Sequence, residues 1–273
     1  MIAYLRLFRV DAALIAFVSY LIGAELAGKA RWQDVAVAAL VTCISTNFIY
    51  SFNSWADRRI DALNKPWRPI PSGQIAAEKA LFYSLFLLIM AVIYPFFIAH
   101  SLLTLLLFQL LPVLGILYSA RPFSFRRNSL LSTLTISIGL VTPLILGYSM
   151  NTAETTLMPL FFGLFIYCLS VVPLKDIEDA EGDRAVGIRN LYLQYENRLP
   201  LFSLAGLTAN LVWICVIPDS QTLNIMLAIV VLATMACILV FQCCRLNMRK
   251  LYRTIIQTVI ALAIILNMII RWG

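Results

Sequence analysis

The chain has 273 residues, of which 61% are hydrophobic and 13% are charged, and its formal net charge is +7. Soluble globular domains carry about 25% charged residues, so this composition excludes an ordinary one. Nucleic-acid binding is the poorer explanation of the positive charge, because no soluble basic domain gathers it. Neither a zinc site nor a histidine-dependent nucleophile is expected, since the six cysteines lack metal-ligand spacing and His100 is the single histidine.

Apolar runs of about 18 to 22 residues recur from end to end, the length that a helix needs to cross the hydrocarbon core of a bilayer. In chain order, the sequence predicts about nine membrane-spanning helices at 10–28, 35–56, 80–99, 101–119, 129–150, 156–175, 199–217, 222–243 and 252–271. The first run is expected to be a retained helix, because no small-residue cleavage site follows it. Since the connections are short, residues 1–273 are predicted to form a single membrane domain of the all-α class.

The basic residues predict how these helices are oriented. Of the 21 Lys and Arg residues, 18 lie at the amino end or in the connections after the even-numbered predicted helices. The other face holds Lys29, Arg31 and Arg271. Because cytoplasmic loops are enriched in Lys and Arg, the amino terminus and the even-numbered connections are predicted to be cytoplasmic. We therefore expect an integral protein of the cell (inner) membrane, whose positive charge also attracts anionic lipid headgroups.

The connection after the second predicted helix begins with three polar residues at four-residue intervals. They are Asn53, Asp57 and Asp61, in the segment NSWADRRIDALNKPWRPIPSG of residues 53–73. A helix turns by about 100° per residue, so their side chains fall at about 0°, 40° and 80° and share one face. Charge beside a bilayer is costly, and this placement therefore indicates a function.

A second acidic segment, KDIEDAEGD, covers residues 175–183 after the sixth predicted helix. On a continuous helix, one face carries three of its acids, Asp176, Asp179 and Asp183. Glu178 and Glu181 point elsewhere. A helix that ended at Gly182 would loosen the placement of the last aspartate.

Two interpretations of these acids remain open. They could be solvated helix ends that pair with neighbouring bases, namely Arg58, Arg59, Lys175 and Arg184. That interpretation suits one cluster better than two clusters that each use one face and lie on the same predicted side of the membrane. Carboxylate oxygens suit Mg²⁺, which keeps several waters and is commonly held by a few carboxylates together with substrate phosphates. The pair of clusters therefore indicates Mg²⁺ and a diphosphate.

Both segments resemble known signatures. N-S-W-A-D-R-R-I-D with N-K-P-W-R-P-I-P-S-G is similar to the first signature of the UbiA superfamily of intramembrane prenyltransferases, and K-D-I-E-D-A-E-G-D-R-A-V-G-I is similar to the second. The resemblance covers essentially the whole chain: both motifs, their separation, the helix count and the cytoplasmic placement. It implies helices around a central cavity, with the active site at the cytoplasmic side. The residues around the second motif are more similar to those of archaeal-lipid-type and homogentisate-type members than to those of the 4-hydroxybenzoate enzymes.

The chain also departs from the pattern of this family. Many members carry an acid directly after the first Asn, where this chain has Ser54. Trp55 and Trp67 replace residues that are usually smaller or differently shaped. These departures concern the acceptor and leave the diphosphate chemistry intact.

By this resemblance, the acidic motifs hold Mg²⁺ and, through it, an isoprenyl diphosphate. The residues implied to be catalytic and to bind the metal are Asp57, Asp61, Asp176, Asp179 and Asp183, with Asn53 beside them for the substrate. A diphosphate leaving group also needs basic donors. The candidates are Arg68, Lys175, Arg121, Arg126 and Arg127, of which the first two lie beside the acidic motifs. Each could instead follow from the bias of basic residues to the cytoplasmic side.

An allylic cation must be kept from water and can be stabilised by aromatic faces. Tyr118 is a candidate for this role, although an aromatic side chain in such a protein more often packs or faces lipid.

The expected function is a Mg²⁺-dependent intramembrane prenyltransferase that transfers an isoprenyl chain from its diphosphate to a lipophilic or aromatic acceptor in the bilayer, releasing diphosphate. No nucleic-acid partner is expected.

Two other functions compete with this one. A terpene cyclase of the same superfamily would use the same acidic motifs to cyclise a prenyl diphosphate without an acceptor. A transporter or channel with an acidic vestibule is disfavoured, because transporters bind their cargo near the bilayer midplane and these acids cluster at the predicted cytoplasmic helix ends.

Overall fold

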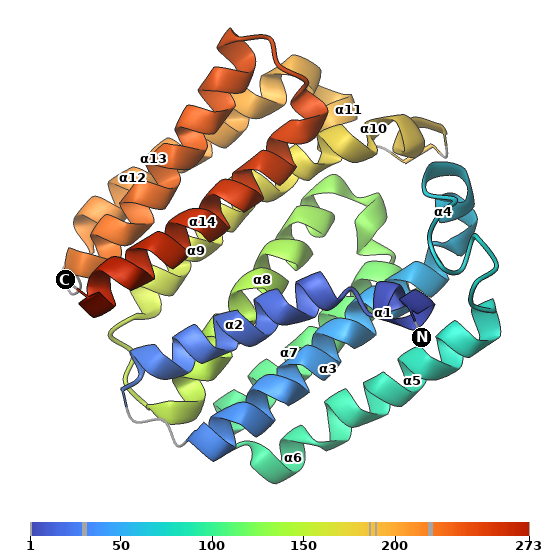
Figure 1. The fold of residues 1–273 in the computed structure, drawn as a ribbon, viewed down its shortest axis with the longest axis horizontal. Helices are drawn as coiled ribbons and strands as arrows, with labels where there is room; N and C mark the ends of the chain where they lie inside the picture. Colours follow the sequence, from blue (N-terminus) through green and yellow to red (C-terminus); the bar gives the residue numbers. More distant parts are fainter. Residues whose placement is uncertain (1, 29–31, 186, 189, 218–220, 273) are drawn as a thin grey trace. The chain divides into compact units, whose positions relative to one another are not determined.

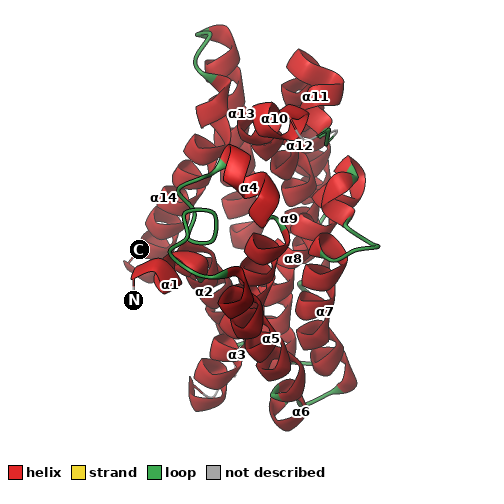
Figure 2. Cartoon of the chain, turned by 90° about the vertical axis from the view of Figure 1, so that its right-hand side faces the viewer, coloured by secondary structure: helices red, strands yellow, loops and turns green. Residues whose placement is uncertain are grey.

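The computed structural model describes residues 2–28, 32–185, 187–188, 190–217 and 221–272, without the side chains of 2, 64, 182, 221 and 263–272. Of the described residues, 84% are helical and none lies in a strand. Figure 2 shows this all-helical architecture, with helices in red and the connecting loops in green. The predicted all-α class is therefore confirmed.

The chain forms two compact units, Met1–Glu154 and Thr155–Gly273, which we call the first and second units. Each unit contains one of the two acidic segments identified in the sequence. That residues 1–273 form a single membrane domain stays a prediction.

The first unit consists of α-helices and one 3₁₀ turn (Figure 1). They are α1 (Ile2–Leu7), α2 (Val10–Leu26), α3 (Trp32–Ala56), α4 (Arg58–Asn64), α5 (Ala77–Ile93), α6 (Pro95–Ile98), α7 (Leu102–Ser119), η1 (Phe125–Arg127) and α8 (Ser129–Asn151). Helix α3 is central, because α2, α5 and α7 all pack against it. Tyr20 and Phe108 are fully buried in the core that these helices enclose.

Helices α2 and α8 pack so closely that glycine is required on both of them. A Cβ on Gly23 of α2 would lie 2.0 Å from the Leu144 carbonyl oxygen, and a Cβ on Gly147 of α8 would lie 2.0 Å from the Tyr20 carbonyl oxygen. Small residues at a helix interface allow this approach in membrane proteins. Packing of α2 on α8 therefore depends on two glycines that are far apart in the sequence.

The first acidic segment lies where α3 passes into α4. Helix α3 ends at Ala56, and Asp57 has φ −91° and ψ 0° at the junction. The helical hydrogen-bond pattern continues across it, because the Asp57 amide donates to the Asn53 carbonyl (2.8 Å) and the Asp61 amide donates to the Asp57 carbonyl (2.8 Å). The three residues thus keep a four-residue spacing on one nearly continuous helical path.

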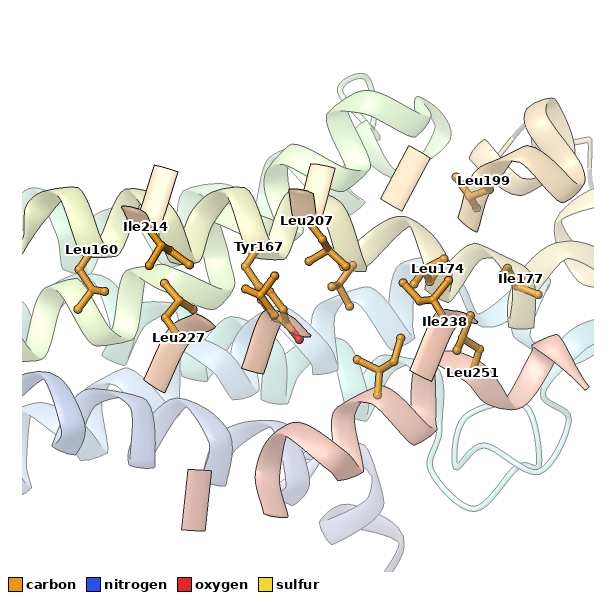
Figure 3. Close-up of a cluster of buried hydrophobic side chains, with 13 residues drawn as sticks. Leu160, Tyr167, Leu174, Ile177, Leu199, Leu207, Ile214, Leu227, Ile238 and Leu251 are labelled. Atoms are coloured by element: carbon orange, nitrogen blue, oxygen red, sulfur yellow. The ribbon is translucent and has the colours of Figure 1, made fainter. Parts of the chain in front are cut away.

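The second unit consists of five longer helices, one short helix and 3₁₀ turns. They are α9 (Met158–Val171), η2 (Val172–Lys175), α10 (Asp176–Ala185), α11 (Leu191–Tyr195), η3 (Glu196–Arg198), α12 (Leu199–Val216), α13 (Gln221–Cys243), η4 (Met248–Lys250) and α14 (Leu251–Trp272). Figure 3 shows their shared core, in which Leu207 and Ile238 are fully buried. The Tyr167 and Thr234 hydroxyls are 2.9 Å apart and satisfy each other within this apolar core.

Seven helical segments in the described part of the chain are long and apolar enough to cross a membrane. They are Trp32–Ala56, Ala77–Ile98, Leu102–Ser119, Ser129–Asn151, Met158–Glu181, Leu191–Val216 and Thr222–Cys243. They coincide with seven of the nine ranges predicted from the sequence. The other two ranges, 10–28 and 252–271, are helical too, as α2 and α14. Helix α2 has 17 residues, and much of α14 has no described side chains.

Candidate functional site

The first acidic cluster, defined as Asn53, Asp57 and Asp61, is held together by side-chain hydrogen bonds and ion pairs. Asn53 Nδ2 donates to Asp57 Oδ2 (3.0 Å) and reaches Ser119 Oγ on α7 (3.3 Å). Its position on α3, one turn before the junction, brings the amide onto the carboxylate, as the four-residue spacing predicts. The amide therefore orients one oxygen of Asp57.

Two arginines neutralise the carboxylates of this cluster. Arg68 Nη1 lies 2.6 Å from Asp61 Oδ2, and the Asp61 side chain is only 8% exposed. Arg126, from the turn η1, forms an ion pair with Asp57, and both side chains are 13% exposed. Ion pairs that are this poorly solvated hold their partners in place, because removing one partner leaves an uncompensated charge.

Arg68 is presented by the loop of residues 65–76 between α4 and α5, which is irregular because of its prolines. Pro66, Pro69 and Pro71 cannot continue α4. Gly73 has φ +74°, a backbone conformation that glycine adopts without strain. Backbone hydrogen bonds close the loop on itself, including one from the Ile75 amide to the Pro69 carbonyl (3.0 Å).

The second acidic cluster, defined as Asp176, Asp179 and Asp183, lies on helix α10. The helix continues through Gly182 to Ala185, so the alternative that it ends at this glycine is wrong. Lys175 Nζ lies 2.9 Å from Asp179 Oδ2, one helical turn further along. The basic residue that adjoins the motif in sequence therefore also adjoins it in space.

Asn190 ties the two ends of this cluster together. Its Nδ2 donates to Asp183 Oδ2 (2.8 Å) and to the Asp176 carbonyl oxygen (3.2 Å). Its Oδ1 accepts from the Leu193 amide and so caps α11, while the Leu191 amide donates to Asp176 Oδ2 (2.9 Å). Asn190 is 5% exposed. Sequence reasoning missed it, although an Asn directly before the apolar run LYLQY is a typical helix N-cap.

The outward acids of α10 pair with the end of the chain. Glu181 forms an ion pair with Arg249 of η4, and Glu178 lies 4.0 Å from Arg253 of α14. They are directed away from the second acidic cluster, as the helical register predicts, and they serve as comparison residues on the same helix.

The other predicted substrate-binding residues lie near the end of α7. Tyr118 is half-buried, and its hydroxyl accepts a hydrogen bond from Ser132 Oγ of α8 (3.5 Å). Arg121 is exposed directly after α7. Arg126, later in the same connection, forms the ion pair with the first acidic cluster.

The carboxylate oxygens in both clusters suit a hard cation that arrives with a phosphate group. Among the described residues, no three carboxylate, thiol or imidazole groups converge into a metal site of their own. Mg²⁺ is usually bound by one or two carboxylates with waters and substrate phosphates, and it does not need such a cage. The carboxylate oxygens, with basic side chains beside them, therefore fit a Mg²⁺–diphosphate pair.

Comparison with known proteins gives a family and a fold. Residues 13–262 match the model of the UbiA prenyltransferase family. A digeranylgeranylglyceryl phosphate synthase from Methanosphaera stadtmanae is 30% identical over 192 residues, which cover 70% of this chain and 68% of that protein. The chloroplastic chlorophyll synthase of Arabidopsis thaliana is 27% identical over 209 residues, which cover 71% of this chain and 51% of that protein. The match thus spans about half of the chlorophyll synthase.

Solved structures agree at the level of the fold. A UbiA homologue from Archaeoglobus fulgidus bound to GPP and Mg²⁺ matches with a TM-score of 0.77 at 18% identity, over 97% of this chain and 99% of that one. The apo structure of a UbiA homologue from Aeropyrum pernix K1 matches with a TM-score of 0.70 at 16% identity, over 94% and 98%. With a family match over nearly its whole length and a shared helical membrane fold, this chain belongs to the UbiA prenyltransferase family and is a membrane-embedded prenyltransferase.

Proposed function

We propose that the protein ionises an isoprenyl diphosphate with the help of Mg²⁺ and transfers the prenyl chain to a lipophilic acceptor within the membrane. One observation carries this proposal: each of the two signature segments forms a helical cluster of carboxylates with a basic side chain in contact. An acidic surface that only served solubility would not need ion pairs in which both side chains are mostly buried.

The proposed reaction breaks the bond between C1 of the prenyl chain and the diphosphate oxygen, and the electron pair leaves with the diphosphate. Mg²⁺, when bound, neutralises the charge that develops on this leaving group. The acceptor atom then forms a bond to C1, and its proton passes to the released diphosphate. Residues of the chain must therefore bind the diphosphate, orient the carboxylates and keep water from the allylic cation.

The contacts in each unit suggest which residues perform these tasks. Asp57, Asp61, Asp176, Asp179 and Asp183 are proposed to hold Mg²⁺, with Asn53 orienting the first of them. Arg68, Arg126 and Lys175 already lie against these carboxylates, and we propose that they donate to the diphosphate oxygens in the complex. We also propose that Tyr118 and Arg121 contact the substrate.

A glycerophosphate that already carries a prenyl chain is the acceptor class we propose first. The support comes from relatives: digeranylgeranylglyceryl phosphate synthases from Methanosphaera stadtmanae and Natronomonas pharaonis are each 30% identical to this chain. Their names imply such an acceptor for those enzymes. We also propose the cell membrane as the location, with both acidic clusters on the cytoplasmic side, in keeping with the distribution of basic residues.

Product analysis by mass spectrometry tests the proposal. The purified protein is incubated with Mg²⁺ and labelled geranylgeranyl diphosphate, with and without a panel of prenylated glycerophosphate, phenolic and quinone acceptors. Transfer of the label to the glycerophosphate, with release of diphosphate, is the expected result. A cyclic hydrocarbon or alcohol formed without any acceptor would identify a terpene cyclase instead. Absence of diphosphate release under all conditions would contradict both functions.

A further inference from the structure

The loop that presents Arg68 is covered by the short helix α1. Leu7, at the carboxyl end of α1, is 1% exposed and packs in one apolar cluster with Ile70 and Ile75 of the loop and Ala80 of α5. Ala3 packs against the same cluster from the preceding turn of α1. This small core is separate from the main core of the first unit, whose residues come from α2, α3, α7 and α8.

A second contact joins the residue directly after α1 to helix α5. The Phe8 ring meets the Tyr83 ring edge-on, with centroids 4.7 Å apart. Tyr83 itself packs against the cluster around Leu7. The amino-terminal segment thus contacts both the 65–76 loop and helix α5, which follows the loop.

The joint between α1 and α2 fixes the direction of this cover. Arg9 has φ +45° and ψ +60°, a left-handed conformation that a residue with a side chain adopts only when its surroundings hold it there. Its guanidinium donates to both oxygens of Asp11 at 3.1 Å and lies over the Tyr50 ring, 5.1 Å from the ring centroid. These contacts turn the chain sharply, so α1 does not simply extend α2.

We propose that α1 is a strap over the 65–76 loop and that Leu7 is a positioning residue for Arg68. Backbone hydrogen bonds close the loop locally, but its two buried isoleucines need an apolar partner from outside the loop. Leu7 supplies that partner. The loop then holds the Arg68 guanidinium against Asp61 (2.6 Å). This role rests on the proposed function of the first acidic cluster in binding the diphosphate.

Helix α1 offers a matched control for testing this role. Leu5 lies two residues before Leu7 on the same helix, but it is 48% exposed. Leu7→Ala and Leu5→Ala remove the same atoms from the same helix, so a difference between them reports the contact with the loop. Leu7→Met keeps most of the buried volume and serves as the conservative variant.

Hydrogen–deuterium exchange of the full chain in lipid nanodiscs, without substrate, measures the strap directly. For Leu7→Ala we expect amides in residues 66–75 to exchange about fivefold faster or more, while α7 keeps its wild-type rates. Leu5→Ala and Leu7→Met are expected to match the wild type throughout. Equal exchange of this loop in the two alanine variants would overturn the strap. If Leu7→Ala does not fold, the wild-type protein provides the test. The strap is overturned if the wild-type amides of residues 66–75 are less protected from exchange than those of the exposed loop at 152–157.

Steady-state kinetics separates positioning from mere stability. Leu7→Ala is expected to raise KM for the prenyl diphosphate about tenfold with kcat within about twofold, because Arg68 acts in binding. Leu7→Met should restore the wild-type KM. A fall in kcat with an unchanged KM would overturn the positioning role. The exchange experiment needs no turnover, so an inactive wild-type protein would refute the proposed function and still leave the strap tested.

Discussion

At the scale of single residues, Arg126 and Arg127 provide a sharp comparison. Both lie on the turn η1, yet Arg126 forms the ion pair with Asp57 and is 13% exposed, whereas Arg127 is exposed. We expect Arg126→Gln to lower kcat/KM for the prenyl diphosphate by about 10- to 100-fold, because a charge-assisted contact is lost next to a poorly solvated carboxylate.

The control is the neighbouring position. Arg127→Gln should leave kcat/KM within about twofold of the wild type, as expected for an exposed charge. Steady-state assays of diphosphate release measure both variants. Equal losses in the two variants would show that general positive charge, and not the pair with Asp57, supports the reaction.

Asn190 gives the corresponding test in the second unit. Asn190→Ala removes the bonds to Asp183 and to the Asp176 carbonyl, and we expect the Mg²⁺ concentration for half-maximal activity to rise about tenfold. Asn247→Ala is the control, since Asn247 also caps a helical turn, through the Arg249 amide, but is exposed. A Mg²⁺ titration of activity measures both, and an unchanged titration for Asn190→Ala would remove this residue from the site.

The residue scale also shows what the sequence could and could not predict. The carboxylates were predictable, because their spacing places them on one helical face. Their partners were not all predictable: Arg68 and Lys175 adjoin the motifs, but Arg126 reaches Asp57 through the fold of the turn after α7. Asn190 likewise reaches Asp183 because the chain turns back after α10. Such contacts depend on tertiary structure, which helical periodicity does not encode.

At the scale of helices, the close packing of α2 on α8 predicts a strong position effect for glycine. Gly147→Ala puts a methyl group within 2.0 Å of the Tyr20 carbonyl oxygen, whereas a Cβ on Gly139 of the same helix meets nothing within 4 Å. We expect Gly147→Ala to destabilise the first unit by about 2 kcal/mol.

Thermal unfolding in detergent measures this difference. Gly147→Ala should lower Tm by about 5 °C. Gly139→Ala should leave Tm unchanged or raise it slightly, because alanine favours the helix more than glycine does. A lower Tm for Gly139→Ala than for Gly147→Ala would contradict the packing of α2 on α8.

Helix boundaries illustrate where sequence patterns reach their limit. All nine predicted ranges are helical, because long apolar runs are a strong signal. The break at Asp57 was not predicted, since the four-residue spacing of Asn53, Asp57 and Asp61 fits an unbroken helix. Gly182 did not end α10, because glycine inside a helix costs only about 1 kcal/mol.

At the scale of the whole molecule, the basic residues predict one orientation in the membrane. Single cysteines can test it in a variant without the native ones. His100→Cys lies at an exposed position in a connection predicted to be outside, and Lys250→Cys lies at an exposed position in a connection predicted to be cytoplasmic. In intact cells a membrane-impermeant thiol reagent should label His100→Cys, and it should label Lys250→Cys only after permeabilisation. The opposite pattern would reverse the topology.

We propose that both acidic clusters serve one ionisation of a prenyl diphosphate. The most direct measurement is Mg²⁺-dependent diphosphate release by Asp57→Asn and Asp179→Asn, compared with Asp34→Asn at the exposed start of α3 and Glu181→Gln on the outward face of α10. We predict that each cluster variant loses about 100-fold or more of its activity, while the two controls stay within about threefold of the wild type. Full turnover by either cluster variant would contradict a shared role of the two clusters in this ionisation.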